Sequence, residues 1–126
     1  MKKLESLKPP AVPAVELRLG PGPRLTLSGT ISTREPDKSL GLFFKEIHDA
    51  VLADVVTEFT IDVCALSFVN SSGIRLFIDW ASRVAKQSGH RYRLRFVRNN
   101  AVTWQRVSFA VIRNIAGDEI IIEDGG

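Results

Sequence analysis

Two adjacent serines, Ser71 and Ser72, occupy the stretch of this chain whose residue types are best suited to chemistry. Asn70 precedes them and Gly73 follows them, directly after an apolar run that ends at Val69. A serine or asparagine at the start of a helix can cap free backbone N–H groups, which contributes about 1 kcal/mol. Residue types and spacing alone favour this capping role. The lysine of a nucleotide-binding P-loop is absent, so the segment is not predicted to bind a nucleoside triphosphate.

The other candidates for catalysis form no recognisable group. Ser71 does not lie in a Gly-x-Ser-x-Gly turn, and the two histidines, His48 and His90, are expected at the surface. Cys64 is the single cysteine, which excludes an intrachain disulfide and a cysteine-based zinc site. We therefore predict no metal, no cofactor and no enzymatic activity.

Composition predicts one globular domain. The chain has 126 residues, of which 44% are hydrophobic and 25% charged, with a formal net charge of +3. A charge this small does not by itself indicate nucleic acid. No apolar run approaches membrane-spanning length, so we expect a cytoplasmic protein without membrane contact.

Hydrophobic periodicity predicts the elements that position the two serines. Pro9, Pro10 and Pro13 mark residues 1–14 as a flexible arm, and residues 15–126 form one domain. The strand from Val55 to Cys64 is apolar enough to be covered on both faces. The expected elements are strands near 15–19 and 25–29 joined by a turn, a helix at 40–51, the strand at 55–64, a helix after Gly73, a strand at 91–98, a helix at 100–109 and a strand at 119–123. This order predicts an α/β (α+β) fold with a mixed sheet, begun by an N-terminal β-hairpin and flanked by helices.

One stretch of the chain resembles a known family. Ile61-Asp62-Val63, Leu66-Ser67-Phe68-Val69 and Asn70-Ser71-Ser72-Gly73-Ile74 are similar to the signature of STAS domains, the anti-anti-sigma factor family. The motif-level match covers residues 60–90, and the order of elements agrees over residues 15–123. The resemblance implies a four- to five-stranded sheet flanked by helices, with no catalytic activity.

The resemblance also implies a mechanism of partner switching. In regulatory members the first serine after the loop aspartate is phosphorylated by a serine kinase that doubles as an anti-sigma factor, and this position is Ser71 here, with Ser72 as second choice. A serine phosphatase is the other implied partner. Asn70 stands where the family pattern has aspartate. The alternative is therefore a scaffold or homo-oligomer subunit that is not phosphorylated.

The helix after Gly73 offers further residues to a partner. Arg75 and Asp79 share its solvent face, and we predict that they bind the partner together with Leu76, Trp80 and residues 70–73. A core position for Trp80 fits the sequence equally well. The core stripe expected on this helix consists of Ile74, Phe77, Ile78, Ala81, Val84 and Ala85.

An arginine-rich strand supports a third function. Arg91, Arg93 and Arg95 alternate with apolar residues, so their guanidinium groups share one face, to which Arg106 and Arg113 could add. Such a stripe could follow a nucleic-acid backbone. The aromatic residues of the strand point inward, however, which removes a base-stacking platform and makes this function less favoured. An acidic protein or a second copy would fit the arginines equally well.

Overall fold

Alternating apolar residues build a five-stranded sheet whose strands lie in chain order, β1-β2-β3-β4-β5. The computed structural model describes residues 2–115 and 117–125. Its strands are β1 (Val15–Leu19), β2 (Arg24–Ile31), β3 (Glu58–Val69), β4 (Arg93–Arg98) and β5 (Ile120–Asp124). The β1–β2 hairpin is antiparallel and every other neighbouring pair is parallel. The predicted fold class, a mixed sheet begun by a hairpin and flanked by helices, is confirmed.

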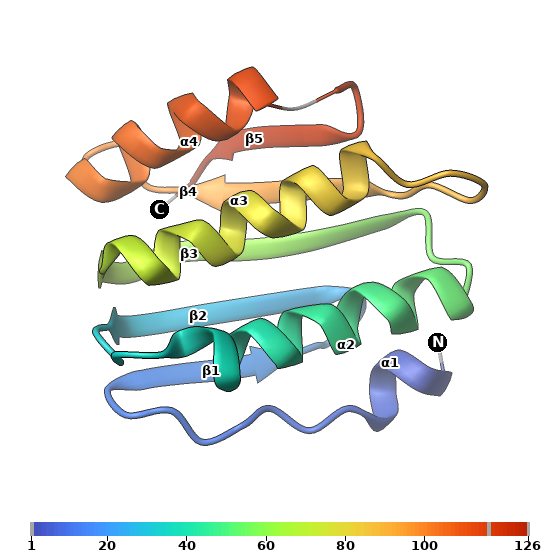
Figure 1. Cartoon of the computed structure of the whole chain (residues 1–126), viewed down its shortest axis with the longest axis horizontal. Helices are drawn as coiled ribbons and strands as arrows, with labels where there is room; N and C mark the ends of the chain where they lie inside the picture. Colours follow the sequence, from blue (N-terminus) through green and yellow to red (C-terminus); the bar gives the residue numbers. More distant parts are fainter. Residues whose placement is uncertain (1, 116, 126) are drawn as a thin grey trace.

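Helices cover one face of this sheet. The helices are α1 (Lys2–Ser6), α2 (Leu40–Ala53), α3 (Ser71–Ala85) and α4 (Thr103–Ile115), with a short 3-10 turn, η1, at Pro36–Lys38. In Figure 1, α2, α3 and α4 all lie in front of the strands. Phe59, Ile61 and Val63 of β3 point toward them and are buried, whereas Thr60 and Asp62 between them are half-buried on the other face. The prediction that this strand is covered on both faces is therefore wrong, because its polar residues alternate with its apolar ones.

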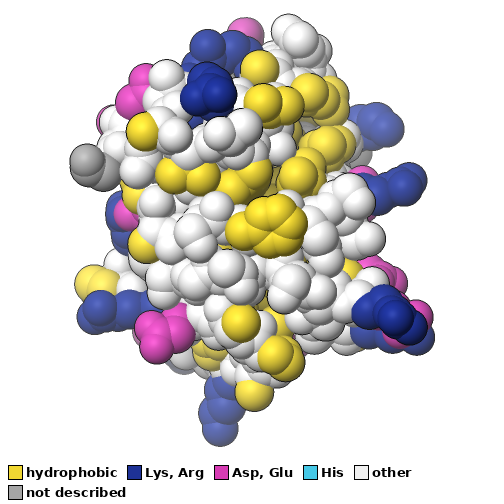
Figure 2. Space-filling model, turned by 90° about the vertical axis from the view of Figure 1, so that its left-hand side faces the viewer, with side chains coloured by type: hydrophobic (Ala, Val, Ile, Leu, Met, Phe, Trp, Pro, Cys, Tyr) yellow, Lys and Arg dark blue, Asp and Glu magenta, His cyan; other side chains and the backbone are white. Residues whose placement is uncertain are grey.

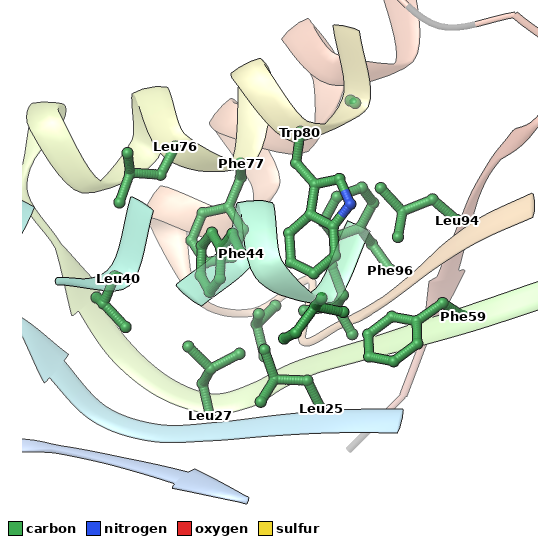
Figure 3. Packing of buried hydrophobic residues seen from close by; sticks show 14 of the residues in the cluster. Leu25, Leu27, Leu40, Phe44, Phe59, Leu76, Phe77, Trp80, Leu94 and Phe96 are labelled. Carbon is green, nitrogen blue, oxygen red and sulfur yellow. The ribbon is translucent and has the colours of Figure 1, made fainter. Parts of the chain in front are cut away.

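The core fills the space between the sheet and the three long helices. Figure 3 shows aromatic side chains of α2 and α3 above leucines of β2. Phe44 contacts both Phe77 and Trp80, with ring centroids 5.5 and 4.9 Å apart. Phe43 and Phe44 are both buried in this core, and Trp104 packs on it while remaining partly exposed. This layer fixes α3 and α4 side by side (Figure 1).

The N-terminal residues do not form an arm outside the core. Leu4 of α1 and Val12 are buried in the same cluster as the core of the sheet. The backbone N–H groups of Leu4 and Lys3 donate to the Asp54 carboxylate at 2.8 and 3.2 Å. These hydrogen bonds, that of Leu4 first, hold the pKa of Asp54 below its usual range. The boundary predicted at residue 14 is therefore wrong, because Leu4 docks α1 on the core and Val12, which lies between Pro10 and Pro13, is buried there too.

Candidate functional site

Asn70 ends β3 and begins α3, and its backbone and side chain bind three different segments. Its Oδ1 accepts a hydrogen bond from the Gly73 N–H at 2.8 Å, which is the helix cap. Its Nδ2 donates to the Thr33 carbonyl at 3.0 Å, and its backbone N–H donates to the Ile31 carbonyl at 2.9 Å. Asn70 thus joins the end of β2 to the start of α3.

Gly73 lies in a place where no side chain fits. A Cβ atom there would stand 2.6 Å from Cγ1 of Val69 and 2.9 Å from Cγ2 of Ile31. Both neighbours are buried, so they have little room to move. This close packing holds the first turn of α3 against the sheet.

The two serine side chains are left free by this arrangement. Ser71 and Ser72 are the first residues of α3, and both are exposed. Within the part of the chain that the structure describes, neither hydroxyl makes a hydrogen bond. Of the three residues that could cap the helix, Asn70 is the one whose side chain does so. The hydroxyls remain at the positive end of a 15-residue helix.

Ser71 and Ser72 face different sides of α3. Residues three or four apart share a side of a helix, so Ser71 lies with Ile74 and Ile78. Ile74 lines a hollow together with Val107 of α4. Ser72 lies with Leu76 and Asp79, which line a separate hollow beside α2.

Three residues predicted to bind a partner, Gly73, Leu76 and Trp80, are buried instead. Trp80 is fully buried and Leu76 is 8% exposed, so neither can present its side chain at the surface. Their prediction as contact residues is wrong, and for Trp80 the core alternative holds. Compared with the predicted stripe, the buried face of α3 is rotated toward α2, because α2 packs against that side of α3. Arg75 and Asp79 are exposed, as predicted.

A buried hydrogen-bond network holds Trp80 in place. Its Nε1–H donates to the Tyr92 hydroxyl at 2.8 Å, and that hydroxyl lies 2.7 Å from Nδ1 of His48. A neutral His48 with Nδ1 as acceptor gives the Tyr92 hydroxyl proton a partner, so all three polar groups are then hydrogen-bonded. Burial first, and Arg83 second, lower the pKa of His48. The surface position predicted for His48 is wrong, whereas His90 is exposed.

Arg93 and Arg95 of β4 lie on the face of the sheet without helices, and carboxylates of that face bind them. Arg95 contacts Glu58 at 3.2 Å and Glu123 at 3.4 Å, and Arg93 contacts Glu58 at 3.3 Å. The hydrogen bond from Arg95 is the largest cause that lowers the pKa of Glu58. Arg91 binds Glu119 at 2.8 Å.

The guanidinium stripe therefore carries its own counter-charges. Arg106 and Arg113 do not extend it, because α4 packs on the opposite face through the contact of Phe109 with Phe96. Tyr92 and Phe96 point into the core, as the sequence predicts.

Phe68 is a surface residue that sequence reasoning missed as a candidate contact. Its side chain is 51% exposed at the end of β3, beside Ile74 and Trp104. Two irregularities in the β2–β3 pairing each insert an extra residue into β3. The signal in the sequence is the spacing of three between Val63, Leu66 and Val69, all of which are buried, where a regular strand would have two.

Comparison with known proteins finds no match for this chain: no family model, no curated protein and no solved structure is significantly similar to it. In residues 2–115 and 117–125, no helix combines the length and hydrophobicity needed to cross a bilayer.

Proposed function

We propose that this chain is a non-enzymatic signalling module of the STAS type, which binds a protein partner around residues 70–75 and releases it when Ser71 is phosphorylated. The observation that carries this proposal is that the capping residue and the exposed serine at the start of α3 are different residues. Asn70 caps the helix, so the exposed Ser71 hydroxyl has no structural task. The mixed sheet begun by a hairpin also agrees with the fold that the resemblance implies.

Phosphorylation at this position would change binding more than folding. A phosphoryl group adds about −1.5 to −2 charges and three acceptor oxygens. The N-terminus of α3 favours such a charge, and Arg75, one turn further on, can pair with it. Inside a docked interface the same charge would be desolvated or repelled. Nearly complete reversal of binding needs about 5.5 kcal/mol of differential affinity, which such a group can supply.

The resemblance suggests the partners and the compartment. A serine kinase of the anti-sigma type would bind and phosphorylate the module, and a serine phosphatase would restore it. Such a pathway is cytoplasmic. Nucleic-acid binding through Arg91, Arg93 and Arg95 has less support, because Glu58, Glu119 and Glu123 bind these side chains.

A pull-down from the native cell lysate tests the proposal. Wild-type, Ser71→Asp and Ser71→Ala baits are compared, and retained proteins are identified by mass spectrometry. We expect a serine kinase or related regulator on the wild-type and Ser71→Ala baits and its loss from Ser71→Asp. Ser72→Asp is the matched control, since it adds the same charge on the α2 side of α3, and it should retain more partner than Ser71→Asp. Identical partners on all baits would contradict the switch.

The second candidate function is a scaffold or oligomer subunit that is never phosphorylated. The observation in its favour is that Asn70 donates to the Thr33 carbonyl, a bond that an ionised aspartate cannot make. The asparagine thus has a structural reason to replace the aspartate of the regulatory pattern. Intact-mass measurement of the protein from cells in several growth phases separates the two functions, because a phosphorylated fraction excludes the permanent scaffold.

A further inference from the structure

An apolar surface lies beside Ser71. Phe68, Val107, Val111 and Ile115 are 40–57% exposed, and they are four of the six large hydrophobic side chains exposed in the described part of the chain. Phe68, Val107, Ile74 and Trp104 line one hollow where β3, α3 and α4 meet. Figure 2 shows this end of the molecule, with a band of hydrophobic side chains across its upper half. We call this hollow and its continuation along α4 the α3–α4 groove.

Helix α4 presents two apolar faces. Phe109 and Ile112 are buried against the sheet. Val107, Val111 and Ile115 recur every four residues on a different side, where no other described element covers them. Val107 and Ile115 are eight residues apart, which corresponds to about 12 Å along the helix. The stripe is therefore as long as about two turns of a second helix. A helix face that is exposed only to solvent would carry polar residues at these positions.

The charges near the groove are positive. No residue that lines its hollow is charged, and Arg75 of α3 and Arg106 of α4 are exposed next to lining residues. Neither arginine has a carboxylate within salt-bridge distance among the described residues, in contrast to the paired arginines of the open sheet face. Asp79 lies on the other side of α3, in the hollow beside α2.

We propose that the α3–α4 groove docks an acidic amphipathic helix of a partner protein. Apolar side chains of that helix would cover Phe68 and Val107, and its carboxylates would meet Arg75 and Arg106. A second copy of this chain fits less well, because a two-fold interface pairs the same patch with itself, and the hollow of this patch has no carboxylate to meet the arginines. A single-stranded nucleic acid also fits less well, since the exposed side chains are mostly aliphatic and offer few rings for stacking.

The groove gives the switch a physical basis, and in this respect the inference rests on the proposed function. Ser71 lies on the side of α3 that bears Ile74, so a phosphoryl group there would stand at the groove. It would oppose an acidic partner by charge and an apolar contact by its hydration. Ser72 faces α2 and would have a weaker effect.

Selection of peptides on the whole protein tests the groove. A randomised display library of peptides about 14 residues long, or about four helical turns, is selected on immobilised wild-type protein. We expect the selected peptides to contain more Asp and Glu than Lys and Arg, with apolar residues at helical spacing. Their affinities are then measured by fluorescence anisotropy for wild type, Phe68→Asp, Val107→Asp and Arg75→Glu.

The groove variants should bind the selected peptides at least about tenfold more weakly than wild type. Val55→Asp is the matched control: Val55 is 64% exposed far from the groove, and its φ of 53° suits aspartate. It should bind as wild type does. Unfolding midpoints of all variants confirm that each is folded, and Phe68→Ser and Val107→Ser replace any that is not.

Several outcomes would overturn the inference: no selected peptide, predominantly basic peptides, equal binding by the groove variants, competition by single-stranded DNA, or a wild-type dimer that Phe68→Asp dissociates in sedimentation. Failure of the groove is distinct from failure of the switch. If a native partner is lost from Ser71→Asp but retained by Val107→Asp, the proposed function stands and docking in the α3–α4 groove is rejected. If peptides depend on the groove residues but bind Ser71→Asp as tightly as wild type, docking in the α3–α4 groove stands and the phosphorylation switch is rejected.

Discussion

At the scale of single residues, the start of α3 depends on an amide that both donates and accepts. Oδ1 of Asn70 accepts from Gly73 while Nδ2 donates to the carbonyl of Thr33. An ionised carboxylate can replace the first bond but not the second. Asparagine at this position therefore attaches the loop after β2 to the start of α3, and this role does not depend on a kinase.

The substitution Asn70→Asp tests this attachment. It should lower the free energy of unfolding by about 1 kcal/mol at neutral pH, because one hydrogen bond is lost and a carboxylate oxygen meets the Thr33 carbonyl. Urea unfolding followed by circular dichroism measures the change. Ser72→Asp is the control, since it adds the same charge to the first turn without removing a bond, and it should be neutral or slightly stabilising. Equal or greater stability of Asn70→Asp would show that the Thr33 bond contributes little.

At the scale of elements, the irregularities in β3 decide which side chain reaches the surface. Ile61 and Val63 point into the core at a spacing of two, and two extra residues then shift the alternation, so that Leu66 and Val69 are buried and Phe68 is not. A bulge that redirects a side chain beside a candidate site is a common device in sheets. The exposure of Phe68 is thus a property of the pairing between β2 and β3.

Helix α1 is the second element whose role depends on a distant contact. Replacing the buried Leu4 by alanine should lower the free energy of unfolding by about 2 kcal/mol, because a filled site in the core is emptied. Lys8→Ala, at an exposed position of the same segment, should change it by less than about 0.5 kcal/mol. Thermal unfolding of both variants measures the difference. Removal of residues 1–7 without loss of stability would restore the interpretation of an arm.

At the scale of the whole molecule, the sheet separates two kinds of surface. One face carries three helices and the core, and the other carries arginines matched by glutamates and an aspartate of neighbouring strands. The network of His48, Tyr92 and Trp80 is buried, and it links α2 and α3 to the residue before β4 through one hydroxyl. Its protonation state therefore affects global stability.

Stability should decrease as the pH falls through the range in which histidine titrates. Burial lowers the pKa of His48 in the folded protein, whereas in the unfolded chain it returns to about 6.5. The unfolded state then takes up a proton more readily, so the free energy of unfolding should fall between about pH 7.5 and 5.5. Urea unfolding at both values measures this loss. His48→Gln should reduce the loss and His90→Gln, at an exposed position, should not; the same loss in all three proteins would contradict the assignment to His48.

By itself the sequence determined the order of the elements from β1 to β5 and the place of the candidate site. The hairpin turn around Pro21, the apolar period of α2 and the Asn70–Gly73 segment are local signals, since each depends on residues close together in the chain. They were sufficient to predict a mixed sheet begun by a hairpin and a serine at the start of a helix.

Only the tertiary structure decided which side chains are available to a partner. Trp80 is buried because α2 and Tyr92 meet over it, and Phe68 is exposed because β3 is bulged against β2. The arginines of β4 are neutralised by Glu58 and Glu123, which lie 37 and 28 residues from Arg95 in the chain. Pairing and packing between such distant segments minimise the free energy of the whole fold, so no local pattern contains them.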